Sequence, residues 1–145
     1  MADPLISFKF SLDMGDNVTG FFTECSGIGS ETEVTDHLVV DENGVDVVMK
    51  LPGRLKYTDI TLKRGITDTM DIWDWRQKVE EGKIDDARTN CSIIMYDREG
   101  TPAAQWDLIN AWPSKVTGPE FKSDSNDYGV EEVVLVHEGM RRVSV

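Results

Sequence analysis

The sequence predicts a mainly β fold of the α+β class: an antiparallel β-sandwich or barrel-like body with one flanking α-helix and a long β-hairpin arm. Three observations lead to this prediction. Gly and Pro separate short runs of alternating apolar and polar residues, one segment has apolar residues at helical spacing, and an Asn-Gly pair divides two valine-rich runs. A chain of 145 residues fits one domain, residues 1–145, and can bury a core without metal or disulfide staples.

Two strands are predicted at the start of the chain. Over residues 8–14, apolar residues alternate with polar ones, so one face of this strand is expected to be buried. A second strand is expected over about residues 18–25. Neighbouring strand residues point to opposite faces, so Phe21 and Phe22 leave the second strand without a fully polar face.

Four further strands are predicted in the rest of the body. They cover residues 56–64, 92–96, 103–112 and 130–137. Trp106, Leu108 and Trp112 are expected on one face of the third, and Pro113 is expected to end it because proline has no backbone N–H. Several strands are apolar on both faces and need cover on both sides. One short helix cannot supply it, so neighbouring copies of the chain are expected to contribute.

One helix is predicted over about residues 69–81. Asp68 is the expected N-cap, and Gly82 is the expected C-terminal stop. The apolar stripe of the helix, expected to pack on a sheet, comprises Ile72, Trp75 and Val79.

The segment from Glu31 to Arg54 is predicted to form the hairpin arm. It holds two apolar runs, residues 38–40 and 45–49, separated by Asp41-Glu42-Asn43-Gly44, whose Asn-Gly pair favours a hairpin turn. Unprotected apolar strand edges invite pairing with another chain. The arm therefore predicts self-assembly.

The net charge of −12 is spread along the chain, with 13 acids and 6 bases in residues 1–72 and 14 acids and 9 bases in residues 73–145. An acidic surface disfavours general binding to nucleic acid or to anionic lipid. No run approaches the roughly 20 apolar residues of a membrane span. The acidic N-terminus is unlike a signal peptide, so synthesis and folding in the cytoplasm without a membrane anchor are expected.

The sequence predicts no catalytic, cofactor-binding or metal-binding residues. It lacks the HExxH, GxSxG and P-loop motifs, and Gly27-Ile28-Gly29 has neither the third glycine nor the following helix of a dinucleotide site. Cys25 and Cys91 are expected to be free thiols. Glu131 and Glu132 point to opposite faces of a strand, so they cannot act as a carboxylate pair and are expected at the solvated surface.

Three blocks in order carry a resemblance to a known family. They are Phe21-Phe22-Thr23-Glu24-Cys25-Ser26-Gly27-Ile28 with Glu31 and Glu33-Val34; Leu51-Pro52-Gly53-Arg54-Leu55-Lys56-Tyr57 with residues 60–67 and Trp73-Asp74-Trp75; and Trp106-Asp107-Leu108 with residues 111–115, Gly118-Pro119 and Glu131-Glu132 to His137-Glu138-Gly139. Together the blocks resemble the tail tube proteins of contractile bacteriophages, and still more the inner tube proteins of extracellular contractile injection systems.

The resemblance implies a single tail-tube domain in a non-enzymatic structural subunit. Such subunits form hexameric rings whose strands join neighbours into one ring-wide β-barrel, and the rings stack into a hollow conduit. The implied partners are further copies of the chain, the sheath protein, the baseplate or tube-initiator protein, the tube-terminator protein, and effector or DNA cargo in the lumen. The implied location is a virion tail or a phage tail-like particle released from the cell.

The resemblance also implies interface residues. The hairpin corresponds to an arm used between subunits or rings, and Arg141-Arg142 either pairs with acids on an adjoining ring or is a frayed, solvated terminus. Leu51-Pro52-Gly53 and Lys63-Arg64-Gly65 are matched elements whose Gly and Pro set backbone geometry. The predicted oligomer interface comprises Leu38, Val39, Val40, Val45, Val47, Val48, Arg141 and Arg142.

Three alternatives remain at the level of the sequence. Within the tube class, these are a tube-initiator ring and a type VI secretion tube subunit. From a different class, a monomeric β-sandwich binding module predicts exposed aromatic residues around a pocket, whereas the spacing of the four tryptophans fits a core better. A small hydrolase is disfavoured because the motifs of a catalytic constellation are missing.

Overall fold

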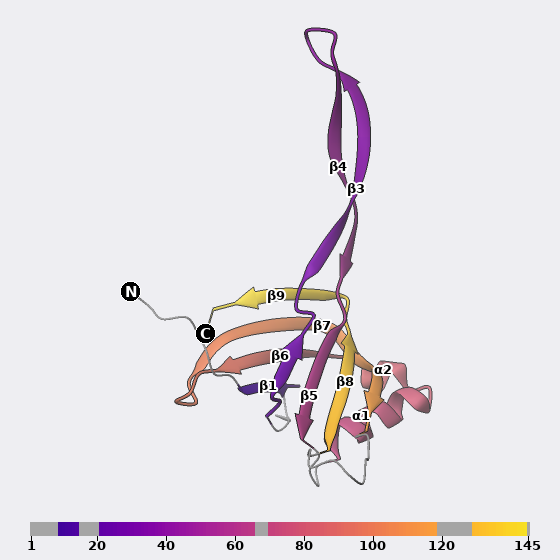
Figure 1. Cartoon of the computed structure of the whole chain (residues 1–145). Helices are drawn as coiled ribbons and strands as arrows, with labels where there is room; N and C mark the ends of the chain where they lie inside the picture. The colour runs from indigo at the N-terminus through magenta and orange to yellow at the C-terminus, as the bar shows by residue number, and fades with distance from the viewer. Residues whose placement is uncertain (1–8, 15–20, 66–69, 119–128, 145) are drawn as a thin grey trace, which may run out of the picture.

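A β-rich body carries a long two-stranded arm in the computed structural model of the chain, which describes residues 9–14, 21–65, 70–118 and 129–144 (Figure 1). The body contains β1 (Lys9–Asp13), β2 (Glu24–Ser26), β5 (Ile60–Gly65), β6 (Thr89–Tyr96), β7 (Pro102–Thr117), β8 (Val130–Val136) and β9 (Gly139–Val143). The arm consists of β3 (Ser30–Val40) and β4 (Asp46–Tyr57). Two helices, α1 (Asp71–Glu80) and α2 (Ile84–Ala87), lie at one end of the body.

The strands of the body form one folded antiparallel sheet in the order β1-β6-β7-β8-β5-β2, with β9 also paired to β7. The first half of β7 pairs with β6 and β9, and its second half pairs with β8. Phe10 and Phe22 exchange two backbone hydrogen bonds of 3.0 and 2.6 Å, which brings the two ends of this strand order together. The predicted fold class, a sandwich or barrel-like body with a flanking helix and an arm, is confirmed.

The core lies inside this folded sheet and under α1. Its members share an exposed fraction below a tenth and are Leu12, Phe22, Ile60, Leu62, Ile72, Trp75, Ala87, Cys91, Ile93, Leu108, Ala111, Val133 and Leu135. The predicted helix is confirmed, since Ile72 and Trp75 face the core and Trp75 Nε1 donates a 2.6 Å hydrogen bond to the Ala87 carbonyl. Alternation and helical spacing thus indicated some of these positions correctly, among them Ile72, Trp75 and Leu108.

The prediction that Pro113 ends its strand is wrong. β7 continues to Thr117, Pro113 is fully buried, and the register shifts between Pro113 and Lys115. Such a bulge lets the strand continue past a residue that has no N–H to donate. Asn110 has a φ of 50° and interrupts the alternation of the strand. The buried residues are Ala104 and Leu108 before it and Ala111 and Pro113 after it, so Trp112 does not share a face with Leu108.

Several element bounds also differ from the predictions. The predicted strand over 56–64 is divided, because β4 ends at Tyr57 and β5 begins at Ile60. Gly27 lies against this break: a Cβ there would lie 2.0 Å from the Asp59 carbonyl oxygen, and its φ is +85°. β9 and the four-residue α2 were not predicted.

Two predictions at the ends of elements fall partly or wholly outside the described residues. Asp68, the predicted N-cap, lies outside them, and so does the first part of the predicted second strand. The described end of that strand contains only β2, Glu24–Ser26. Met70 holds the N-cap position of α1 without a side-chain capping hydrogen bond.

A buried charge cluster joins α1 to the sheet. Arg64 Nε lies 3.0 Å from Glu131 Oε2, Arg64 Nη2 lies 2.8 Å from Asp71 Oδ1, and Trp73 Nε1 donates a 2.7 Å bond to Glu131 Oε1. Burial opposes the charge on Arg64, but the hydrogen bonds to Asp71 and Glu131 raise its pKa above the ordinary value. The predicted solvent exposure of Glu131 is therefore wrong, since the residue is 2% exposed.

Candidate functional site

The arm is the most unusual surface of the molecule. Its strands have 11 and 12 residues and extend well beyond the predicted apolar runs, from Ser30 to Tyr57. Figure 1 shows the arm projecting away from the body, with no other element packed along most of its length. Every residue of β4 except Tyr57 is exposed, and in β3 only Val39 is partly covered.

A four-residue turn forms the tip of the arm, as predicted. Asp41 Oδ1 accepts 2.9 Å hydrogen bonds from the backbone N–H groups of Asn43 and Val45, and the Asp41 N–H donates to the Val45 carbonyl at 3.0 Å. Gly44 takes a φ of 76°, which glycine adopts without strain. The tip is thus held by Asp41 in addition to the Asn-Gly signal that predicted it.

A bulge changes the register near the base of the arm. The pairing shifts between Thr32 and Val34, so that Glu33 lies opposite both Gly53 and Arg54. A Cβ on Gly53 would lie 3.1 Å from the carbonyl oxygen of Glu33, so glycine is the residue that fits this close approach. The structure thus bears out the geometric role predicted for Gly53.

The two faces of the arm beyond the bulge differ in charge. Side chains of directly paired residues share a face, and successive residues alternate between faces. One face, called here the uncharged face, carries Thr35, His37, Val39, Val47, Met49 and Leu51. The other, called here the mixed face, carries Val34, Asp36, Leu38, Val40, Asp46, Val48, Lys50 and Pro52.

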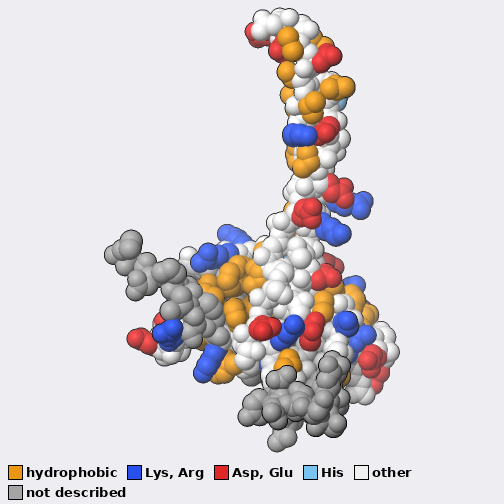
Figure 2. All heavy atoms as spheres, in the orientation of Figure 1, with side chains coloured by type: hydrophobic (Ala, Val, Ile, Leu, Met, Phe, Trp, Pro, Cys, Tyr) orange, Lys and Arg blue, Asp and Glu red, His pale blue; other side chains and the backbone are white. Residues whose placement is uncertain are grey.

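Both faces expose large apolar side chains to solvent. On the mixed face Leu38 is 72% exposed and Val48 53%, whereas on the uncharged face Val47 is 39% exposed and Met49 47%. Figure 2 shows these hydrophobic side chains along the arm, interspersed with acidic and basic ones. Single exposed apolar residues are common on protein surfaces, but a continuous apolar surface of this extent marks an interaction site.

The structure brings six of the eight predicted interface residues together on the arm. Leu38, Val40 and Val48 lie on the mixed face, Val39 and Val47 lie on the uncharged face, and Val45 follows the turn. The prediction missed the exposed apolar residues Val34, Met49, Leu51 and Leu55. The alternation of apolar residues past the two valine-rich runs was the signal that could have found them.

The other two predicted residues, Arg141 and Arg142, lie on β9 and not on the arm. They are paired through β9 to Asp107 and Trp106 of β7, so this part of the chain is an ordered strand and not a frayed terminus. The Arg142 guanidinium lies 5.8 Å from the centre of the Trp106 ring. Hydrogen bonds from Gln105 and Ser92, with the charge of Arg141, lower the pKa of Asp107.

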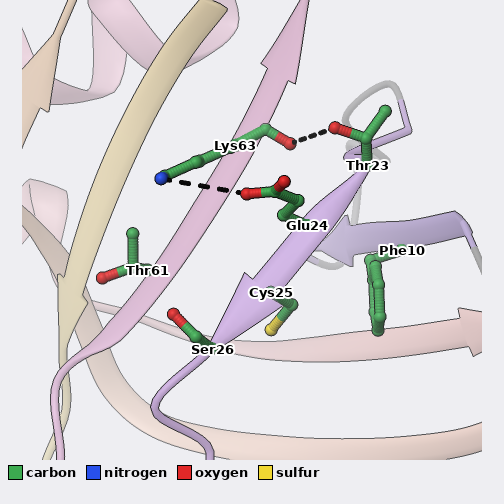
Figure 3. A pocket seen from close by; sticks show the side chains of 7 residues that line it. All are labelled: Phe10, Thr23, Glu24, Cys25, Ser26, Thr61 and Lys63. Atoms are coloured by element: carbon green, nitrogen blue, oxygen red, sulfur yellow. Dashed lines mark hydrogen bonds and ion pairs between the residues drawn. The ribbon is translucent and has the colours of Figure 1, made fainter.

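An open hollow of about 370 Å³ lies beside β2 (Figure 3). It is lined by Phe10, Thr23, Glu24, Cys25, Ser26, Thr61 and Lys63. Lys63 and Glu24 point toward each other across it, with Nζ and Oε2 3.8 Å apart. Burial raises the pKa of the Cys25 thiol to about 12, so it stays protonated and is a weak nucleophile near neutral pH.

The described part of the chain offers neither a cluster of metal ligands nor a membrane-spanning helix. Among these residues, no group of three or more His, Cys, Asp or Glu side chains is arranged to hold a metal ion. Within the same residues, neither helix has the length and apolar character that a bilayer span requires.

The sequence matches the model of the T4-like virus tail tube protein gp19 family over residues 6–141. The chain belongs to this tail tube family. The family is one of structural proteins, and the resemblance predicted from the three sequence blocks is confirmed. No curated protein matches the sequence significantly.

Solved structures share the fold. A chain of the PVC sheath–tube complex, an extracellular contractile injection system in the extended state, gives a TM-score of 0.80 at 25% identity over 98% of this chain and 93% of that chain. A chain of the anti-feeding prophage tube-terminating cap gives 0.81 at 22% identity over 100% and 94%. Hcp1 from Flavobacterium johnsoniae gives 0.56 at 12% identity over 92% and 94%. The last two likenesses show a common fold, and the first agrees with the tail tube family.

Proposed function

We propose that this tube protein is a non-enzymatic subunit that assembles into stacked hexameric rings and forms the hollow conduit of a contractile injection system or phage tail. The observation that carries the proposal is the arm: a tail tube family member has a projecting hairpin whose apolar side chains nothing in the described chain covers. A hairpin without a covering layer is marginally stable alone. Contact with other copies would supply the missing cover.

The tube acts by being stiff, with no chemistry of its own. Strands of adjacent subunits continue one sheet around the ring, which removes exposed strand edges. Apolar burial and main-chain hydrogen bonds across large interfaces resist bending. Contraction of the surrounding sheath then drives the conduit forward, and effector or DNA cargo passes through the lumen.

The proposed partners follow from this role. They are the sheath protein around the tube, a baseplate or initiator protein at one end, a terminator at the other, and further copies of the chain. The likeness to a chain of a sheath–tube complex at 25% identity supports the sheath contact. The proposed location is the cytoplasm during synthesis and then a virion tail or a released phage tail-like particle.

Negative-stain electron microscopy of the purified full chain tests the proposal. Uniform rings or stacked cylinders with a central channel are the expected result, at high protein concentration or on addition of its initiator protein. A chain that stays monomeric by sedimentation at every concentration, with initiator present, would contradict self-assembly. Such a result would favour a monomeric β-sandwich binding module.

A further inference from the structure

The mixed face of the arm carries charges that favour contact with water. Asp36 Oδ1 and Lys50 Nζ lie 2.6 Å apart, and their side chains remain 62% and 65% exposed. Asp46 lies on the same face, opposite Val40. Moving such groups out of water costs several kcal/mol per ion, and an ion pair recovers that only with excellent geometry.

The uncharged face carries no such cost. Val39 pairs with Val47, His37 with Met49, and Thr35 with Leu51, so no carboxylate or ammonium group lies along this strip. Val47, Met49 and Leu51 are still 38–47% exposed, which leaves apolar area for a partner to cover. Covering it removes apolar surface from water, which favours association. Of the two faces, this one is therefore suited to docking.

Charge indicates what docks there. The tip at the end of this face, residues 41–45, carries two acids, Asp41 and Glu42, and no basic residue. A complementary surface needs positive charge beside apolar area. β9 provides both: Arg141 and Arg142 are exposed, Ile109 of the neighbouring β7 is 52% exposed on the same face as Arg141, and Arg142 lies over the Trp106 ring on the opposite face.

The arm cannot reach the β9 of its own chain. β9 lies beside the base of the arm, whereas the arm extends away from the body for roughly 35 Å, at about 3.3 Å per residue of β3 (Figure 1). Figure 2 shows Lys and Arg side chains gathered on the body near the arm base, and acidic side chains at the arm tip. The complementary surface must therefore belong to a second copy.

We propose that the uncharged face of the arm docks beside β9 of a second copy of this chain, with the acidic tip near the Arg141 and Arg142 of that copy. The mixed face stays in contact with water. This inference rests on the proposed function, because it specifies which face of the arm assembly buries and which surface receives it.

Val47 and Val48 form a matched pair for the test, because they are neighbours of the same residue type on opposite faces. Val47→Asp is expected to raise the protein concentration needed for assembly by about tenfold or more, since a carboxylate would be buried without a partner. Val48→Asp adds the same charge to the mixed face and is expected to leave that concentration near the wild-type value. Sedimentation velocity measures both, with circular dichroism to verify the fold.

A photo-cross-linker identifies the receiving surface. Benzoylphenylalanine at position 47 of the full-length chain is expected to give a strong intermolecular product whose peptides map to β9 and the neighbouring part of β7. The same group at position 48 is expected to give little product. Cross-links from position 47 to another surface would overturn the assignment of β9.

A charge reversal checks the same contact. Arg141→Glu with Arg142→Glu is expected to weaken assembly, and Glu42→Arg in the same chain is expected to restore part of it. Asp41 is left unchanged because it holds the turn.

The outcomes separate this inference from the proposed function. Tubes that assemble with Val47→Asp and Val48→Asp equally impaired, or with equal cross-linking from both positions, would overturn the face assignment and leave the tube function standing. A wild-type chain that neither assembles nor cross-links from either position would overturn both.

Discussion

The body and the arm are built from the same kind of β-strand, yet they use it in opposite ways. In the body, alternation separates buried from solvent-facing residues: Ile60 and Leu62 are 0% and 1% exposed, and Thr61 between them is partly exposed. In the arm, alternation separates a face without charged residues from a face that mixes apolar residues with Asp36, Asp46 and Lys50, and both faces are exposed. The body therefore buries a core of its own, whereas the arm requires a partner to cover its apolar side chains.

The comparison also explains where stability resides. The folding free energy of an isolated chain should come almost entirely from the body, because the arm buries little apolar area. The arm should open locally in the monomer and become protected on assembly. Each of the following predictions tests one part of that contrast.

The largest effect is expected at the buried charge cluster of the body. Glu131→Ala leaves Arg64 buried without one of its two carboxylate partners and removes the acceptor of Trp73 Nε1, so the free energy of unfolding should fall by about 3–5 kcal/mol. Urea denaturation of the monomer measures this. Glu132→Ala is the matched control on the opposite face, and an equal loss there would contradict a specific role for the cluster.

The next effect compares one leucine in each region. Leu135 is 0% exposed in β8 and Leu38 is 72% exposed in β3. Leu135→Ala should reduce the free energy of unfolding of the monomer by about 2–5 kcal/mol. Leu38→Ala should change it by about 0.5 kcal/mol or less, as is usual for exposed positions. Equal losses by urea denaturation would mean that the arm is packed in the isolated chain.

A smaller, pH-dependent effect belongs to the body alone. Burial raises the pKa of the Cys25 and Cys91 thiols from 9.0 to about 12, so above pH 9 the unfolded chain releases thiol protons that the folded chain retains. The unfolded state then binds fewer protons, and the free energy of unfolding should fall as pH rises from 9 toward 12. Each thiol contributes about 1.4 kcal/mol per pH unit within that window.

The measurement is urea denaturation at pH 8 and pH 10. The double variant Cys25→Ala and Cys91→Ala lacks the two thiols and should therefore lose less free energy of unfolding between these pH values than the wild type. All other titratable groups are the same in both proteins. Parallel losses would contradict retained protons on the buried thiols.

Much of this fold was predictable because strand alternation and glycine-proline punctuation are local signals. They located the α1 stripe of Ile72 and Trp75, the turn at Gly44 and the buried strand position Leu108. Signals that depend on distant parts of the chain were missed. Pro113 is tolerated by a bulge in its pairing with β8, and Glu131 is buried because Arg64 lies opposite it in the sheet.

The candidate site divides in the same way. The valine-rich runs beside Gly44 predicted an arm and its central interface residues from local sequence alone. The separation into two faces required the register, since Val39 opposite Val47 and Leu38 opposite Val48 follow from a four-residue turn held by Asp41. A two-residue turn would have paired the strands differently. Arg141 and Arg142 were selected from the sequence because of their charge. Their pairing with Asp107 and Trp106 depends on β9, a strand that was not predicted from the sequence.

The smallest effect uses one turn that occurs in both regions. Asp97 in the β6–β7 turn accepts hydrogen bonds from the N–H groups of Glu99 and Thr101 at 2.9 Å each, as Asp41 does in the arm, and Gly100 matches Gly44. Asp97→Ala should lower the free energy of unfolding by about 1 kcal/mol, because the turn closes a hairpin of the core sheet. Asp41→Ala removes the same two bonds but should leave that free energy nearly unchanged.

In Asp41→Ala, hydrogen exchange should instead show reduced protection within the arm, at the amides of Asn43 and Val45. Equal changes in global unfolding for the two variants would show that the arm folds cooperatively with the body even in the monomer. If only Asp97→Ala lowers the free energy of global unfolding, the difference between the two hairpins lies in their cover, because their turns are held by the same hydrogen bonds. Under that result, assembly should raise the exchange protection of the arm far more than that of the body.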